Sequence, residues 1–324
     1  MSLPDVGSVV SFAIPLRTRF RRVTRRSGVL VRGAAGWGEF SPFPEYPPSV
    51  TRRWAAAARE ATEEGWPPAV RASVPVNVTV PAVPAAEAHA IVSASGCRTA
   101  KVKVAEPGQG EADDLARVEA VRDRLGRSGK LRVDANGAWD VETAARMVRR
   151  LDAFDLEYVE QPVATLEEMA RLRRLVDVPL AADESVRTAA DPLRVAGLDA
   201  ADLVVLKVQP LGGVRAALAV AEASGLPVVV SSAVETSIGL AAGLALAAAL
   251  PELPYACGLG TAGMLEGDVV ADPLIPEDGE LRVRRLEPDA AALRRWQAEP
   301  SEHAALVARY EAAAAAADPA EAAP

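Results

Sequence analysis

The sequence is poor in histidine and cysteine, and the two shortages exclude several kinds of chemistry. Its two histidines, His89 and His303, stand beside no nucleophile-like motif, so a Ser-His-Asp mechanism or a histidine-rich metal site would depend on one residue. Its two cysteines, Cys97 and Cys257, are too few for a disulfide framework or a multi-cysteine zinc site. We expect surface histidines, buried apolar cysteines, and acid-base chemistry performed by Lys, Asp, Glu or Tyr.

Long apolar runs and a basic surplus are absent as well. The longest apolar candidate, Ile238 to Leu250, falls short of the roughly 20 residues that span a bilayer, and the N-terminus shows no signal peptide. We therefore expect a cytoplasmic protein. The net charge of −8 gives no footprint for nucleic acid. The arginine-rich stretch from Arg17 to Arg26 alternates with Phe20 and Val23, which is typical of an edge strand or hairpin, and a role near an anionic substrate is a further possibility.

The 324 residues suffice for one large α/β barrel and a smaller partner. Residues 1–73 predict a small α+β unit with strands at 9–12 and 28–32, an ordered loop at 39–48 and a helix at 52–65. Residues 74–279 alternate eight short apolar runs with seven helical stretches, which is the rhythm of a (β/α) barrel of modified TIM type. An open doubly wound sheet is the alternative, but its G-x-G-x-x-G turn is absent.

The predicted strands of the barrel are 74–80, 100–104, 131–135, 158–161, 180–183, 203–208, 228–232 and 256–259. The predicted helices are 85–95, 111–125, 141–153, 166–176, 191–198, 214–224 and 237–250. Beyond them we predict a strand at 280–286, a helical segment at 290–317 broken at Pro300, and a frayed end from residue 311. Part of 280–324 is expected to return to the N-terminal unit.

Charged residues stand at the ends of five consecutive predicted strands. In chain order these are Lys101 and Lys103, then Asp134, Glu160, Asp183 and Lys207. Successive positions lie about one strand-helix unit apart, which places them at the C-terminal rim of a barrel, where barrel enzymes keep their sites. One charge at a strand end is usually a cap or a solvated group, but five in this order are not easily explained by chance.

The three carboxylates are expected to converge at this rim. Close anions repel strongly in a medium of low dielectric constant, and a hard divalent cation relieves that repulsion. Ligation by oxygen alone with open positions suits Mg²⁺, with Mn²⁺ as a second possibility. Lys101 and Lys103 point the same way because side chains alternate along a strand, and Lys207 faces them from the other side.

The strand-end motifs are Lys101-Val102-Lys103, Asp134-Ala135-Asn136, Val159-Glu160-Gln161-Pro162, Ala182-Asp183-Glu184-Ser185 and Leu206-Lys207-Val208. Together with 37–42 and Ser231-Ser232, they resemble the muconate lactonizing subgroup of the enolase superfamily, and within it the o-succinylbenzoate synthase family. The resemblance covers the chain to about residue 265. It implies that the N-terminal unit is a capping domain, with 14–20 and 40–46 as lids over the barrel mouth.

The resemblance also implies a mechanism. Asp134, Glu160 and Asp183 would bind the metal, Lys103 would take the α-proton beside a metal-bound carboxylate, and Lys207 would face the opposite side of the substrate. The resulting enediolate needs fixed positive charge, and Lys101 would help to lower the pKa of the base. The implied reaction is the syn dehydration of 2-succinyl-6-hydroxy-2,4-cyclohexadiene-1-carboxylate to 2-succinylbenzoate in menaquinone biosynthesis.

Other residues are weaker candidates. Asn136 and Glu184 are expected to support the metal ligands, although Glu184 is as well explained as a helix cap. Arg132 should point into the barrel, where it either pairs with a core carboxylate or helps to bind a second substrate carboxylate. The predicted substrate contacts are completed by Ser232, Gly260 and Arg19.

Two other reactions and one non-enzyme role remain open on sequence grounds, while a further reaction is disfavoured. N-succinylamino acid racemisation uses the same two lysines, and muconate cycloisomerisation shares the metal site. Dipeptide epimerisation is disfavoured, because the eighth strand carries Gly258-Leu259-Gly260 where those enzymes have Asp-x-Asp for an ammonium group. A catalytically dead barrel that only binds a ligand is the non-enzyme alternative, but no predicted ligand is lost.

Overall fold

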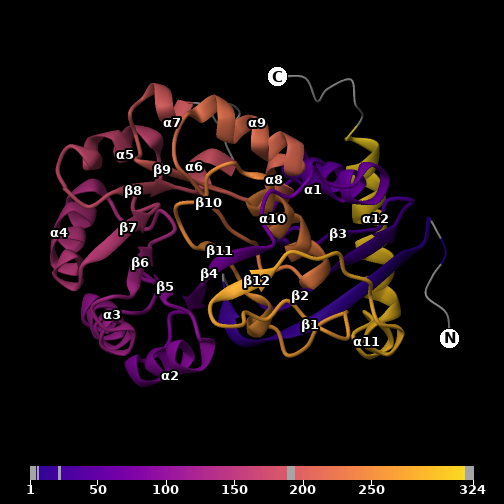
Figure 1. Cartoon of the computed structure of the whole chain (residues 1–324), viewed down its shortest axis with the longest axis horizontal. Helices are drawn as coiled ribbons and strands as arrows, with labels where there is room; N and C mark the ends of the chain where they lie inside the picture. The colour runs from indigo at the N-terminus through magenta and orange to yellow at the C-terminus, as the bar shows by residue number, and fades with distance from the viewer. Residues whose placement is uncertain (1–4, 6, 21–22, 188–193, 318–324) are drawn as a thin grey trace.

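The computed structural model describes residues 5, 7–20, 23–187 and 194–317 (Figure 1). A small antiparallel sheet of three strands comes first, formed by β1 (Val9–Phe20), β2 (Val23–Arg32) and β3 (Trp37–Phe40) in that order. Alternate residues of β1 enter its core, with Phe12, Ile14 and Leu16 all buried. The arginine-rich segment lies on the antiparallel strands β1 and β2, which agrees with the prediction of a hairpin. Residues 21 and 22 lie outside the described chain.

Helices from both ends of the chain cover this sheet. The first is α1 (Pro48–Arg59), which continues into a π-helical turn (Glu60–Glu64) and stops at Gly65. The C-terminal helices are α11 (Ala290–Arg295) and α12 (Pro300–Ala315). Figure 1 shows α12 running beside α1 and the sheet. Helix α12 therefore packs against α1 and this sheet, while the assignment of part of 280–324 to the N-terminal domain stays a prediction.

In the described part of the chain, eight parallel strands form the main path of the larger sheet, in the order β10-β9-β8-β7-β6-β5-β4-β11, and a ninth strand pairs with β4 off this path. Their bounds are β4 (Ser73–Val80), β5 (Thr99–Lys103), β6 (Lys130–Asp134), β7 (Leu156–Glu160), β8 (Leu180–Ala182), β9 (Leu203–Leu206), β10 (Val228–Val230) and β11 (Cys257–Gly260). A parallel bridge between Ser231 and Gly258 joins β10 to β11 and completes the ring. The curled, parallel-rich sheet beside an antiparallel one confirms the predicted fold class.

Helical segments connect these strands and surround the ring. They are α2 (Ala85–Ser95), α3 (Glu111–Leu125), α4 (Val141–Leu151) with a 3-10 turn (Asp152–Phe154), α5 (Leu166–Arg173), α6 (Glu184–Arg187), α7 (Arg194–Gly197), α8 (Val208–Leu211), α9 (Val214–Ser224) and α10 (Ser237–Ala249). Local caps set several starts: Thr165 and Glu168 form a capping box on α5, and Asp140 caps α4. Residues 237–248 of α10 are all buried, because the helix lies between the ring and β3.

The rest of the chain closes the structure. A 3-10 turn (Ala262–Met264) follows β11, and β12 (Glu280–Arg282) pairs antiparallel with β4. Within the described residues, no helix is both long and apolar enough to cross a membrane. The domain boundary at residue 73 stays a prediction.

Several sequence predictions need correction. The first strand is twelve residues long rather than four, and β3 was missed because its four residues are all buried and show no alternation. Three barrel strands were drawn too long: β8 ends at Ala182 and β9 at Leu206, because α6 and α8 each begin two residues later, and β10 ends at Val230. The strand predicted at 280–286 is shorter as well, because β12 ends at Arg282. The predicted helix at 191–198 and the predicted frayed end lie partly outside the described residues, but α12 is regular through Ala315.

The scarce residues mostly behave as expected. Cys97 and Cys257 are free and buried, and His89 is exposed. His303 differs, because its ring is half-buried and Nδ1 lies 2.8 Å from the hydroxyl of Ser11.

Candidate active site at the C-terminal rim of the barrel

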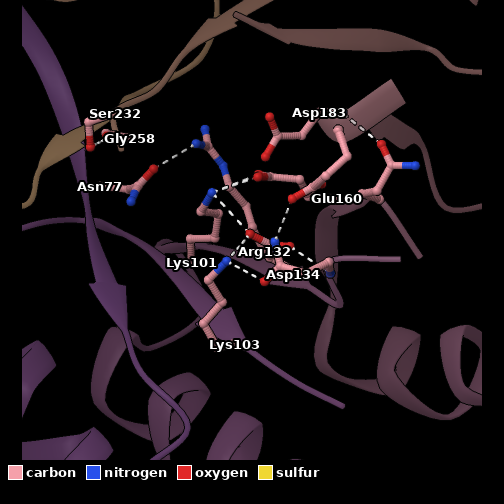
Figure 2. Close-up of polar contacts among 12 residues, drawn as sticks. Asn77, Lys101, Lys103, Arg132, Asp134, Glu160, Asp183, Ser232 and Gly258 are labelled. Carbon is pink, nitrogen blue, oxygen red and sulfur yellow. Dashed lines mark hydrogen bonds and ion pairs between the residues drawn. The ribbon is translucent and has the colours of Figure 1, made fainter. Parts of the chain in front are cut away.

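Sheet register brings the charged residues together. Lys103 is paired with Asp134 across β5 and β6, and Asp134 with Glu160 across β6 and β7. Asp183 and Lys207 follow the last residues of β8 and β9. Figure 2 shows Lys101 and Lys103 pointing towards the carboxylates of Asp134 and Glu160. The five strand ends therefore deliver their side chains to one rim, because parallel strands in register end on the same face.

Each carboxylate in this cluster faces a lysine. The Lys101 ammonium lies 2.7 Å from Oε1 of Glu160 and 3.3 Å from Oδ2 of Asp134. Lys103 lies 2.5 Å from the same Asp134 oxygen, and Lys207 lies 2.5 Å from Oδ2 of Asp183. Removing one partner would leave a buried charge uncompensated, which is costly.

Burial and crowding of like charges perturb these groups. Burial raises the pKa of Glu160 to about 7, and the neighbouring Asp134 carboxylate adds to the rise while Lys101 opposes it. Burial also acts to raise the pKa of Asp134, but Lys103 and Lys101 outweigh it and hold that pKa well below its usual range. Burial acts to lower the pKa of Lys101, and the carboxylates of Glu160 and Asp134 reverse this and raise it.

The donor set suits a hard cation, although the side chains are arranged as ion pairs. Across the described ranges, no three Asp, Glu, His or Cys side chains form a group arranged to hold a metal ion. Asp134, Glu160 and Asp183 nevertheless offer only oxygen donors, all are buried, and the charges of the other two raise the pKa of Glu160. A divalent cation would relieve that repulsion and release the lysines from their present partners.

Asn136 links the cluster to the next loop. Its Oδ1 accepts a hydrogen bond from Lys103 at 2.7 Å, and its Nδ2 donates to Oε1 of Glu184 at 3.1 Å. Its own backbone N–H donates to Oδ1 of Asp134 at 3.0 Å. Asn136 therefore touches both a predicted metal ligand and the predicted base, which agrees with a supporting role. Its role in supporting the metal ligands stays a prediction.

Arg132 lies deeper in the ring. Its guanidinium contacts Oε2 of Glu157 and the carbonyl oxygen of Ala256, both at 2.6 Å. Figure 2 shows its contact with Asn77, whose Oδ1 lies 3.2 Å away. It also lies 4.7 Å from the centre of the Tyr158 ring. Of the two sequence alternatives, these contacts favour pairing with a core carboxylate.

The three lysines line a small, partly open cavity of about 30 Å³. Its lining residues are Phe20, Phe43, Thr79, Lys101, Lys103, Asn136, Lys207, Ser231, Ser232, Ala233, Val234, Gly258 and Thr261. The ring of Phe20 lies 5.3 Å from the Lys103 ammonium, so the hairpin reaches the predicted base. A wider hollow of about 930 Å³ lies outside and includes Arg19 and Phe20.

The three predicted substrate contacts differ in whether they line a cavity. Ser232 lines the inner cavity, with its hydroxyl 3.0 Å from the carbonyl oxygen of Gly258 and 2.9 Å from the hydroxyl of Thr261. Arg19 lines only the outer hollow, and Gly260 lines neither. A Cβ atom on Gly260 would lie 2.8 Å from the carbonyl oxygen of Asn77, so a side chain there would disturb β4.

Sequence reasoning missed two polar residues that line the cavity. Thr79 is in register with Lys101 and points into the same space. Its alternation with valines along β4 was a usable signal, because the last polar residue of a barrel strand faces the site. Thr261 follows β11 in a turn without regular periodicity, and no signal in the sequence marks it.

Known proteins resemble both parts of this chain. The family model of enolase C-terminal domain-like proteins matches residues 84–289, and that of enolase N-terminal domain-like proteins matches residues 11–62. The o-succinylbenzoate synthase of Thermobifida fusca is 65% identical over 94% of this chain and 96% of its own length. The enzyme of the same name from Mycobacterium tuberculosis is 53% identical over 89% of this chain and 88% of its own.

A solved structure shows the same architecture. The muconate lactonizing enzyme of Pseudomonas fluorescens, complexed with muconolactone, superposes with a TM-score of 0.78. The match covers 90% of this chain and 98% of that one, at 24% sequence identity. At that identity the likeness concerns the fold.

Proposed function

Because this chain belongs to the enolase superfamily and, within it, to the o-succinylbenzoate synthases, we propose that it is a carbon-oxygen lyase of menaquinone biosynthesis. The reaction is the dehydration of 2-succinyl-6-hydroxy-2,4-cyclohexadiene-1-carboxylate to 2-succinylbenzoate. The observation that carries this assignment is the 65% identity to a relative of that name over nearly the whole chain. The lysine-carboxylate rim supports it independently, because it supplies the groups that the reaction needs.

Asp134, Glu160 and Asp183 are the residues proposed to hold a divalent cation, with Mg²⁺ expected and Mn²⁺ an alternative. When bound, the cation supplies Lewis-acid stabilisation of the charge that develops on the substrate carboxylate. The oxygen-only donors and the crowding that raises the pKa of Glu160 support this assignment. Asn136 and Glu184 would orient the Asp134 and Lys103 side chains from outside.

Lys103 is proposed as the base. As a neutral amine it would remove the proton α to the substrate carboxylate, and the resulting ammonium would protonate the departing hydroxyl group. The carbon-hydrogen and carbon-oxygen bonds both break, water leaves, and the six-membered ring becomes aromatic. One residue can serve both steps only if both groups leave from the same face, which makes the elimination syn.

Lys207 and Lys101 would contribute fixed charge. Lys207 lines the same inner cavity as Lys103, so its ammonium would stabilise negative charge on the substrate from the other side. Lys101 sits behind Lys103, with 5% of its surface exposed, and its charge would favour the neutral form of the base.

The other reactions considered for this site are less well supported. N-succinylamino acid racemisation and muconate cycloisomerisation would use the same residues, but the relatives that match at 65% and 53% identity carry the name o-succinylbenzoate synthase. A dead barrel is disfavoured, because every strand-end residue of the set is present. The proposed partner is a small carboxylate; nucleic acid and membrane remain unexpected, and the cytoplasmic location stays a prediction.

The direct test follows the absorbance of the cyclohexadiene substrate. Enzyme and Mg²⁺ should remove it quickly, and both EDTA and the Lys103→Ala substitution should stop the loss. No loss with a folded, metal-loaded protein would contradict the proposal. Exchange of the α-hydrogen of N-succinylamino acids in deuterium oxide would then test the racemase alternative.

A further inference from the structure

Val234 has a strained backbone beside the inner cavity. Its φ angle is +60°, in the left-handed region that β-branched residues rarely enter. It lines the cavity together with Ser232 and Lys207, in the loop between β10 and α10. Such a conformation is strained and persists only where surrounding contacts hold it in place.

A guanidinium from the small sheet holds the Val234 carbonyl. Arg26 lies on β2 with 2% of its surface exposed, and its Nε donates to the oxygen of Val234 at 3.1 Å. Its Nη2 donates to the carbonyl oxygen of Ser41 at 2.5 Å, and its charge lies 4.2 Å from the centre of the Phe43 ring. Arg26 therefore joins two segments of the small sheet to the strained residue of the barrel loop.

A carboxylate from the same sheet binds the first turn of α10. Glu39 lies on β3 with 4% exposure and accepts hydrogen bonds from the Thr236 hydroxyl at 2.5 Å and the Gly239 N–H at 3.0 Å. The backbone N–H of Thr236 lies 3.3 Å from its other oxygen. The first N–H groups of a helix have no partner within the helix, so these hydrogen bonds satisfy them and fix where the loop ends.

The loop also folds back on itself. Oε2 of the buried Glu235 accepts a hydrogen bond from the N–H of Ala233 at 2.8 Å, while Oε1 has no hydrogen-bond partner in the described part of the chain. Gly239 makes room for this arrangement: a Cβ there would lie 2.6 Å from Cβ of Glu235 and 2.8 Å from Oε2 of Glu39. The loop is therefore held from three directions, two of them from the other sheet.

We propose that Arg26 and Glu39 are positioning residues, which hold residues 231–236 in the strained conformation that places Ser232 and Val234 against the substrate. This role rests on the proposed function, because those two residues line the inner cavity together with Lys103 and Lys207, the residues proposed to flank the substrate. The lysines and carboxylates stand on other strands. We call the contacts of Arg26 and Glu39 with residues 231–239 the clamp. Loss of the clamp should weaken substrate binding more than it slows the chemical step.

The test compares two neighbouring arginines. Arg26→Met removes the buried guanidinium, and Arg25→Met is the matched control, because Arg25 precedes it on β2, is half exposed and pairs with Glu302 at the surface. The readouts are hydrogen exchange of the backbone amides in 231–240, kcat and KM, and the dissociation constant of 2-succinylbenzoate with Mg²⁺. Arg26→Met should accelerate exchange about tenfold and raise KM and the dissociation constant about tenfold, with kcat within about threefold of the wild-type value. Arg26→Lys should recover part of each change, and Arg25→Met should change none.

Gly239→Ala keeps every charged side chain and serves if Arg26→Met does not fold. It should displace Glu39 from the helix end, with the same faster exchange and higher KM. Unchanged exchange in 231–240 and unchanged KM in a folded variant would overturn the proposal, as would a fall in kcat alone. If the wild-type protein binds no 2-succinylbenzoate, the proposed function fails, whereas the exchange comparison still decides whether the clamp exists.

Discussion

Arg117 donates a hydrogen bond from Nη1 to the main-chain carbonyl of Lys103 over 2.9 Å. The same nitrogen contacts Oδ1 of Asp114 at 2.8 Å, and Oδ2 of Asp114 accepts from the N–H of Ala105 at 2.8 Å. Ala105 has a φ of +59°. A buried pair on α3 thus holds both sides of the strand end that carries the proposed base.

This pair predicts an effect on rate from outside the cavity. Arg117→Met should lower kcat by about tenfold and leave KM nearly unchanged, because it loosens the backbone of Lys103 without touching Ser232. It should also cost about 3 kcal/mol of stability, since Asp114 would be left buried without its partner. Steady-state kinetics and denaturant unfolding measure the two effects. A rise in KM as large as the fall in kcat would argue against a selective role in positioning Lys103.

The proposed base has a direct test. Lys103→Ala should reduce kcat by about 10²–10⁴-fold, the usual contribution of a general base. Lys101 remains near Asp134 in this variant, so the protein should fold and bind 2-succinylbenzoate with Mg²⁺. Near-normal kcat in Lys103→Ala would assign the proton transfer to another group.

Metal binding should be visible without turnover. Mg²⁺ at about 100 times its dissociation constant should add about 2.7 kcal/mol to the free energy of unfolding of the wild-type protein. Asp134→Asn should abolish this gain, whereas Asp272→Asn should retain it, because Asp272 is an exposed residue paired with Arg284. Calorimetry with and without EDTA measures the difference. Equal gains in the two variants would place the ion elsewhere.

The buried carboxyl of Glu39 should make stability depend on pH. Burial raises its pKa from 4.5 to about 7, although the hydroxyls of Ser41 and Thr236 oppose the rise. Between these values the folded state binds more protons than the unfolded state, so stability falls as pH rises through this window. Its charged neighbours are Glu235, which adds to the rise, and Arg26, which opposes it.

The size of that dependence follows from the shift. A rise from 4.5 to about 7 corresponds to a change of about 3 kcal/mol in the free energy of unfolding across this pH window. Glu39→Gln should remove this contribution. Unfolding in urea at a series of pH values, in EDTA, would compare the variant with the wild type. Glu160, whose pKa is also raised to about 7, is present in both proteins, so the difference between their pH profiles reports on Glu39 alone. Parallel pH profiles would contradict the raised pKa.

The barrel and its rim were predictable because each depends on a local pattern. Apolar runs and helices alternate regularly, and each of five consecutive strand ends carries its own charged residue, so Asp134, Glu160 and Lys207 could be located one at a time. The clamp could not be located in this way. Arg26 meets Val234 and Glu39 meets Gly239 across about 200 residues of sequence, and no periodicity links such positions. Short buried strands such as β3 are hidden for a related reason, because burial on both faces removes the alternation that marks a strand.

The pairing of three lysines with three carboxylates has a consequence for the order of binding. The formal charges of these six side chains cancel, so together they offer no net attraction to a substrate with two carboxylates. With all three lysines protonated, a divalent cation would give the same group a surplus of two positive charges, equal and opposite to the substrate; with Lys103 as the neutral base the surplus would be one. Capture of the dianion should therefore follow arrival of the cation, at a rate that falls with ionic strength. The enzyme would then bind its substrate only after the cation has bound.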